Sequence, residues 1–229
     1  MASWMVHLRV ADRFLDKLEN IDKTAFVVGN IAPDSGVPNE DWSVYTPSKE
    51  VSHFKKRVDG NAFFDIDEFC EKYFNEELNK TYDKRTFSFF LGYYVHLLTD
   101  NEWTEKVLRP LVDSHPEEAA ADRNKLVWTA KGDWYDIDFR YLKEHPDFRA
   151  FALYENAVGF ENVYMDMFAK NAFDQRRQYI CGYYRSDNHG DLYRNYEYLT
   201  PEQSAEFVES TVEKISLVLS IFCGCSVSM

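Results

Sequence analysis

The stretch that decides the fold is "FFLGYYVHLLTDNEW", which runs from Phe89 to Trp103. It is apolar almost throughout, yet it carries His96 and Asp100 four residues apart, and Gly92 stands four residues before the histidine. In a helix, residues four apart lie above one another on the same face. The stretch therefore predicts a central helix whose buried face carries an imidazole and a carboxylate.

The rest of the chain also shows helical periodicity. His7, Ala11, Phe14 and Leu18 share one face of a predicted first helix. Further helices are expected over 65–77, from 86 to about 111, from 116 onward, over 147–170 and from 201 onward, the last with a capping box of Thr200 and Gln203. Residues 30–42 and 183–198 are expected to be irregular. Because few runs alternate as strands do, the predicted fold is all-α, a single-domain multi-helix bundle over residues 1–229.

Composition excludes several classes of partner. The formal net charge is −13, and 17% of the residues are aromatic, which suits a substantial core. An acidic chain lacks the positive footprint of non-specific nucleic-acid binding and has no electrostatic attraction to anionic membranes. A small anionic substrate remains compatible with this charge if metal ions reverse the local field.

Cysteine usage and the chain ends indicate a cytoplasmic protein. Cys70, Cys181, Cys223 and Cys225 are too few and too scattered for a disulfide framework, and the terminal pair is expected to be reduced thiols on a helix. The first residues lack the pattern of a signal peptide. The apolar run 215–225 is much shorter than the roughly 20 residues that span a bilayer, so no transmembrane segment is expected. The sequence does not define an oligomeric state.

The polar residues of the central helix have two explanations. Burying an imidazole or a carboxylate without a hydrogen-bond partner costs free energy, so each of these side chains is expected to have a partner. His96 and Asp100 could hydrogen-bond each other or the backbone and only fix helix packing. They could instead bind one metal ion, since ligands at i and i+4 of a helix reach a common ion, as in H-x-x-x-H zinc motifs.

Three other residues favour the metal explanation. His7 lies on the apolar stripe of the first helix, Asp34 lies in the turn "NIAPDSG", and His53 lies in "KEVSHFKK". Each has an ordinary explanation alone, as a core histidine, a turn-capping aspartate and an exposed histidine. Together with His96 and Asp100 they supply the nitrogen and oxygen ligands that zinc takes.

In this order, four segments resemble one known family. "MASWMVHLRVADRFL", "FVVGNIAPDSG", "SHF" and "GYYVHLLTDNEW" are similar to the zinc-dependent phospholipase C family, in its small intracellular bacterial branch. More distantly they resemble the fungal zinc single-strand nucleases, which share its helical metal scaffold. The resemblance covers roughly the first 110 residues, and "DWYDIDFRYL" at 133–142 also resembles that branch.

The resemblance implies an all-α bundle with metal ions held between helices. It implies that His7 binds one zinc, that Asp34 and His53 bind another, and that His96 and Asp100 complete the site, with Asp100 bridging two ions. The ligands would thus lie within residues 1–105. Asp34 would be a ligand or the catalytic group that orients the attacking water.

The chain departs from the family pattern in two places. The secreted phospholipases use the free amino group of an N-terminal tryptophan as a ligand, whereas Trp4 is internal here. They also hold a third zinc with an H-x-x-x-E pair. The later histidines His115, His145 and His189 are followed four residues on by Ala119, Arg149 and Tyr193, so that pair is absent. One or two zinc ions are therefore expected.

Three functions remain, in order of preference. The first is a hydrolase of phosphoric esters, a phospholipase C-like phosphodiesterase that uses a zinc-activated water on a small phosphate-containing substrate. The alternative is a non-catalytic metal-binding or interaction protein on the same scaffold. The His-Asp phosphohydrolase superfamily ranks last, because no histidine is followed directly by aspartate.

The motif "DNHGD" stays open at this point. Its Asp187, His189 and Asp191 are expected to form a polar turn, although they could close over a metal site from a loop.

Overall fold

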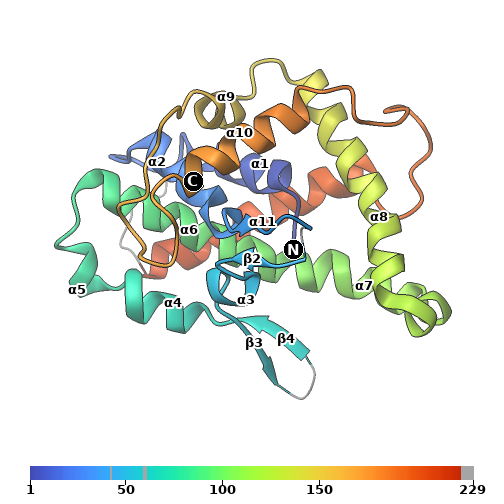
Figure 1. Ribbon diagram of the computed structural model, residues 1–229, viewed down its shortest axis with the longest axis horizontal. Coiled ribbons are helices and arrows are strands. Elements are labelled where there is room, and N and C mark those ends of the chain that lie inside the picture. Colours follow the sequence, from blue (N-terminus) through green and yellow to red (C-terminus); the bar gives the residue numbers. More distant parts are fainter. Residues whose placement is uncertain (42, 59–60, 223–229) are drawn as a thin grey trace.

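A computed structural model describes residues 1–41, 43–58 and 61–222, and helices dominate this part of the chain (Figure 1). The helices are α1 (Trp4–Phe14), α2 (Lys23–Ile31), α3 (Lys49–Ser52), α4 (Ile66–Tyr73), α5 (Glu76–Asn79), α6 (Lys84–Trp103), α7 (Arg109–Ser114), α8 (Pro116–Glu144), α9 (Arg149–Glu155), α10 (Ala172–Tyr184) and α11 (Pro201–Phe222). A 3-10 turn, η1 (Ala32–Asp34), follows α2, and a π-helical turn, η2 (Thr104–Leu108), joins α6 to α7. The predicted all-α class is confirmed.

Within the described residues, four short strands form two antiparallel pairs. One pair is β1 (Val37–Pro38) with β2 (Tyr45–Thr46), and the other is β3 (Lys55–Val58) with β4 (Asn61–Phe64). The second pair is a hairpin that projects from the helical body (Figure 1). The sequence between these strands, Asp59 and Gly60, is a common hairpin signal that the helical interpretation passed over.

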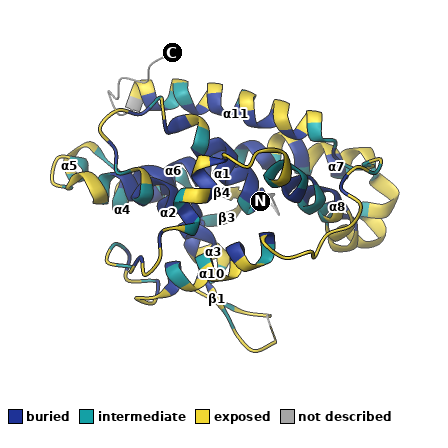
Figure 2. Cartoon of the chain, turned by 90° about the horizontal axis from the view of Figure 1, so that it is seen from above, coloured by how far each residue is buried: buried dark blue, intermediate teal, exposed yellow. Residues whose placement is uncertain are grey.

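Helix α6 lies at the centre of the molecule, as its apolar sequence predicts. Figure 2 shows α1, α2 and α6 largely buried and α11 with one buried and one exposed face. Helices α2 and α6 approach so closely that a Cβ on Gly29 would lie 2.0 Å from the Phe89 carbonyl oxygen. A Cβ on Gly92 would lie 2.0 Å from the Phe26 carbonyl oxygen. The two glycines therefore permit a backbone-to-backbone crossing.

The helical path continues beyond α6, as predicted for residues 86–111, but it is not regular. Pro110 lacks an N–H, and its ring excludes the carbonyl of the residue four positions before it. The chain accommodates this proline by widening into η2 directly before α7. Such π-turns recur near functional sites.

The prediction of one helix over residues 147–170 is wrong. Helix α9 ends at Glu155, and the chain then runs without regular structure to α10. Gly159 has a φ of +71°, which a helix does not accommodate. The Asn162 side chain holds the loop: its amide donates to the carbonyls of Met165 and Phe168, and its oxygen accepts from the backbone N–H groups of Tyr164 and Met165.

The other predicted boundaries hold with small changes. The segment 65–77 divides into α4 and α5, and α2 and α10 had not been assigned from sequence. The capping box of α11 is present, because the Thr200 N–H donates to Gln203 Oε1 and the Gln203 N–H donates to Thr200 Oγ1. Its predicted stripe of Val208, Val212, Ile215 and Leu219 is buried.

Two further observations concern the cysteines and membranes. Cys70 and Cys181 are free, as expected, while Cys223 and Cys225 lie outside the described residues. Across the described ranges, none of the helices combines the length and the apolar character that crossing a bilayer requires.

Candidate metal centre

The five predicted site residues converge from four separate elements. His7 comes from α1, Asp34 ends η1, His53 follows α3, and both His96 and Asp100 lie on α6. All five are buried: Asp34 is 9% exposed and the other four are fully enclosed. The crossing of α2 over α6 carries η1 toward the polar face of α6, and the Ser3 hydroxyl caps α1 by accepting from the Val6 N–H.

The ligand atoms form two overlapping groups. His7, His96 and Asp100 make one group, and Asp34, His53 and His96 make the other, with the ligand atoms of each group within 4.8 Å of one another. His96 Nε2 lies 3.2 Å from His53 Nε2 and 3.6 Å from Asp100 Oδ2. His53 Nε2 lies 3.6 Å from Asp34 Oδ1. The rings of His7 and His96 stack with centroids 3.7 Å apart.

Hydrogen bonds behind the rings fix which nitrogens face the centre. His96 Nδ1 lies 2.7 Å from the Asn30 carbonyl oxygen, which only a protonated nitrogen can satisfy, so in the neutral ring the lone pair is on Nε2. His53 Nδ1 lies 3.0 Å from Ser52 Oγ. The Tyr93 hydroxyl donates to the Ser52 carbonyl oxygen and so holds the backbone beside His53. This pattern matches the outer partners that orient metal-binding histidines.

Buried polar atoms without partners show that the residues fit a cation. Both ring nitrogens of His7 and Asp100 Oδ2 are buried and have no hydrogen-bond partner among the described residues. Leaving such atoms unsatisfied costs about 1–3 kcal/mol each. A cation between His7, His96 and Asp100 would satisfy one of the two His7 nitrogens and Asp100 Oδ2, because a neutral imidazole and a carboxylate are the ligands that zinc takes.

The electrostatic environment keeps the donor atoms in their ligating states. Burial lowers the pKa of His53 to about 3 and also lowers the pKa of His7, so both rings are neutral at pH 7. Burial alone would raise the pKa of Asp34, but Lys49 and the nearby histidines outweigh it and lower that pKa to about 2. The pKa of Asp100 is also well below its ordinary value, because charges and hydrogen bonds outweigh burial.

Comparison with known proteins agrees with this geometry. Residues 6–103 match the family described as zinc dependent phospholipase C. This segment belongs to that family. All five clustered residues fall within the matched range, which is narrower than the roughly 110 residues of the sequence resemblance. No curated protein and no solved structure matches the chain.

The zinc-dependent phospholipase C segment receives support from residues outside it. Asp138, in the segment 133–142, accepts from Ser3 Oγ at 3.0 Å and from the Tyr184 hydroxyl at 2.7 Å. The Ala2 backbone N–H donates to Asp100 Oδ1 at 2.8 Å. Asp138 therefore holds the first turn of α1, and with it His7, against α6. In the sequence, the segment 133–142 was distinguished only by its resemblance to the family, and a supporting role for Asp138 was not predicted.

Two lysines beside Asp34 were also missed. Lys49 Nζ lies 4.0 Å from Asp34 Oδ1, and Lys131 lines the same small hollow as Asp34 and Lys49. Burial and the neighbouring Lys49 both lower the pKa of Lys131. In the zinc-dependent phospholipase C segment, Asp34 is therefore buried at the edge of a small hollow that two lysines also line.

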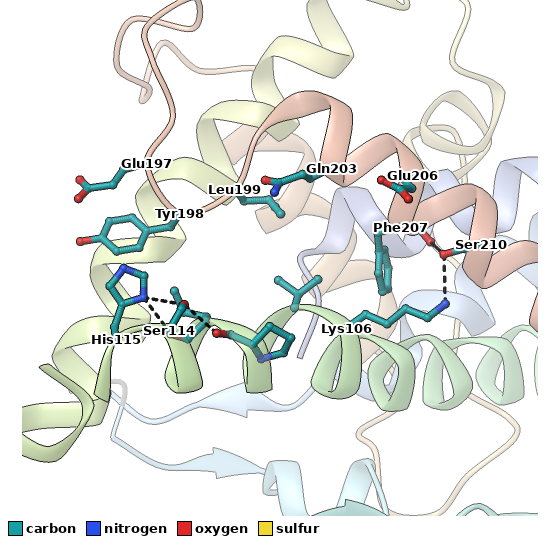
Figure 3. Close-up of a pocket in the computed structure, with 13 residues that line it drawn as sticks. Lys106, Ser114, His115, Glu197, Tyr198, Leu199, Gln203, Glu206, Phe207 and Ser210 are labelled. Carbon is teal, nitrogen blue, oxygen red and sulfur yellow. Dashed lines mark hydrogen bonds between the residues drawn. The ribbon is translucent and has the colours of Figure 1, made fainter. Parts of the chain in front are cut away.

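The remaining histidines lie apart from the cluster. His189 is exposed, and its Nδ1 lies 2.8 Å from the Gly190 carbonyl oxygen, while Asp191 Oδ1 accepts from the Tyr193 N–H. "DNHGD" is therefore a polar turn. His115 lines a different hollow of about 500 Å³ between α7 and α11, which contains none of the five cluster residues (Figure 3).

Proposed function

We propose that the protein hydrolyses phosphoric esters, with one or two zinc ions bound by His7, Asp34, His53, His96 and Asp100. The observation that carries the proposal is the convergence of these buried side chains with unpartnered ligand atoms turned toward one another. The family match of residues 6–103 supports it independently.

The chain contributes the ligand atoms, the hydrogen bonds that orient the histidine rings, and the ionised carboxylates. His96 and His53 present Nε2 to the centre because their Nδ1 atoms face the Asn30 carbonyl oxygen and Ser52 Oγ. Asp100 Oδ1 lies 3.4 Å from His7 Nε2, and its Oδ2 lies 3.7 Å from His53 Nε2 and 3.6 Å from His96 Nε2, distances that support our proposal that Asp100 would contribute to binding more than one ion. Zinc, when bound, acts as a Lewis acid toward the phosphoryl oxygen and lowers the pKa of water to near 7.

Asp34 is the proposed catalytic residue. It is the one member of the cluster that reaches the surface hollow, and its low pKa keeps it ionised at neutral pH. An ionised carboxylate can accept a hydrogen bond from the attacking water and orient it, or it can bind zinc directly. Lys49 and Lys131 beside it would attract the anionic phosphate.

The test begins with protein stripped of metal by a chelator. Adding zinc should restore hydrolysis of bis(p-nitrophenyl) phosphate, p-nitrophenyl phosphate or a short-chain phospholipid, and Asp34→Asn should reduce that hydrolysis by about 100-fold or more. Exposed His189→Asn is the matched control and should keep full activity. Zinc bound in the expected amount with no hydrolysis of any of these esters would contradict the proposal and favour the non-catalytic alternative.

A further inference from the structure

A basic cleft borders the metal cluster of this acidic chain. The cleft has a volume of about 320 Å³ and is lined by Met1, Lys55, Arg57, Phe64, Thr104, Leu108, Arg109, Arg123, Asn124, Val127 and Trp128. Four of these residues are Lys or Arg and none is Asp or Glu, although the chain has 39 acidic and 26 basic residues. A cleft with one sign of charge concentrates ligands of the opposite sign.

The cations of the cleft come from three separate elements. Lys55 and Arg57 alternate with Lys56 along β3, so they share one face of the strand, while Lys56 pairs with Glu68. Arg123 extends from α8. Lys55, Arg57 and Arg123 form no ion pair with any residue that the structure describes, whereas Arg109 pairs with Glu105. Three positive charges therefore remain available to a ligand.

The cleft is adjacent to the surroundings of the cluster. The Phe64 ring packs against the His53 ring with centroids 6.0 Å apart. Thr104 Oγ1 donates to the Asp100 carbonyl oxygen at 2.9 Å. Met1 lines both the basic cleft and the hollow that contains Asp34. A molecule bound at the cluster could thus extend into the cleft past the apolar side chains of Phe64, Leu108 and Val127.

We infer that the cleft is a subsite for a second phosphate group of the substrate. This inference rests on the proposed hydrolysis of phosphoric esters and narrows it to a substrate class: small esters that carry a second phosphate beyond an apolar or neutral spacer. Guanidinium groups suit that group, because they form charge-assisted hydrogen bonds to phosphate oxygens. The cleft volume lies within the roughly 300–1,000 Å³ range of small-molecule sites.

The test compares two probes of equal length by titration calorimetry on the zinc-loaded protein. Hexane-1,6-diol bisphosphate should bind about tenfold more tightly than 6-hydroxyhexyl phosphate, which lacks the second anion. The double variant Arg57→Gln, Arg123→Gln should lose this preference, because both side chains are exposed and line the cleft. Lys125→Gln should keep it, because Lys125 is exposed on the same helix but does not line the cleft.

Equal binding of the two probes by the wild type, or a preference that the double variant retains, would overturn the inference. Tighter binding to phosphatidylserine vesicles than to the bisphosphate, with the same charge dependence, would also overturn it in favour of a membrane surface. The titration needs no turnover. A failure to hydrolyse any of the esters named above would therefore count against the proposed function and leave the subsite measurement intact.

Discussion

At the scale of single residues, the site depends on histidines that burial keeps neutral and on aspartates that neighbouring charges keep ionised. His96 is the member common to both ligand groups, so its removal leaves two ligands in each. Loss of an outer partner alone typically weakens metal binding 10–100-fold, and loss of a ligand should cost about 100-fold or more.

His96→Ala should therefore reduce bound zinc to a small fraction of the wild-type content after dialysis against a zinc-buffered solution. Elemental analysis gives the stoichiometry, and far-UV circular dichroism verifies that the variant folds. His115→Ala is the control, because that histidine lies in the hollow between α7 and α11. An unchanged zinc content in His96→Ala would contradict the assignment of both groups.

The buried histidines also predict how stability depends on pH in the metal-free protein. The pKa of His53 falls from 6.5 in the unfolded chain to about 3 in the folded state, and that of His7 is lowered as well. Unfolding then takes up protons below pH 6.5, so stability is lost as the pH falls through this window. For one fully buried histidine the slope is at most about 1.4 kcal/mol per pH unit.

Asp138 opposes this trend and provides the control. Burial raises its pKa to about 7, so it binds a proton on folding over much of the same range. Asp138→Asn should therefore make the loss of stability between pH 6.5 and about pH 4 steeper than in the wild type. Urea unfolding with a chelator present measures both slopes, and equal slopes would show that Asp138 does not titrate in this window.

The sequence predicted the five converging residues because each carries a distinctive side chain at a family-like spacing. It did not predict what orients them. The Asn30 carbonyl oxygen is a backbone atom, and Asp138 reaches Ser3 across 135 residues. Contacts of this kind depend on how helices cross in three dimensions, and the spacing of residues along the sequence does not predict those crossings.

At the scale of elements, the crossing of α2 and α6 explains the glycine beside the buried histidine. A Cβ on Gly92 would lie 2.8 Å from the Asn30 backbone nitrogen as well as 2.0 Å from the Phe26 carbonyl oxygen. The close approach brings the Asn30 carbonyl oxygen within reach of His96 one turn later. The same crossing therefore builds the core and orients a ligand.

Gly92→Ala should destabilise the protein by about 3 kcal/mol or more, because backbone atoms cannot yield to an added methyl group as flexible side chains do. It should also weaken zinc binding by moving His96 away from Asn30. Gly182→Ala is the control: it lies in α10, nothing is within 4 Å of its added Cβ, and the variant should gain about 0.5–1 kcal/mol. Chemical denaturation of both variants measures the difference. A neutral Gly92→Ala would show that the helices can separate without cost.

Periodicity predicted long, apolar helices better than short or interrupted ones. Helix α6 follows its pattern because it is buried on almost all sides, and helix α11 follows its pattern because one face is buried. Residues 147–170 carry a comparable aromatic pattern, yet the Asn162 side chain supplies hydrogen bonds that replace the helical ones. Side-chain to backbone competition of this kind is invisible to a count of apolar spacings.

At the scale of the whole molecule, the helical core and the metal cluster make separate contributions to stability. The core contains many large apolar side chains that do not touch the cluster, so the helices should persist without metal. Zinc should nevertheless raise the melting temperature, because a ligand of the folded state stabilises it by RT ln(1 + [L]/Kd). At 100 times Kd the gain is about 2.7 kcal/mol.

Differential scanning calorimetry of stripped protein, with and without zinc, measures this gain. The His96→Ala variant should show no increase in melting temperature, while its far-UV spectrum stays helical. A wild-type melting temperature that does not respond to zinc would contradict a cluster that binds metal only in the folded chain.

At this scale the net charge of the chain also differs in sign from the charge of one cleft. The net charge of −13 argues against a broad positive footprint, yet it gives no indication of the cleft formed by Lys55, Arg57, Arg109 and Arg123. These residues are spread over almost seventy positions and meet only because the β3–β4 hairpin lies near α7 and α8. The net charge of a sequence cannot show that particular basic residues cluster in the folded chain.

A neutral His96 ring has a single lone pair, on Nε2, and this has a consequence for how the protein would bind metal ions. One lone pair cannot serve two cations at once, and Nδ1 is committed to the Asn30 carbonyl oxygen. The first cation to arrive would take that lone pair and leave the other position with fewer donors and a repelling positive neighbour. A zinc titration should accordingly show negative cooperativity, with a tight first step and a much weaker second, so that at limiting zinc singly loaded molecules predominate.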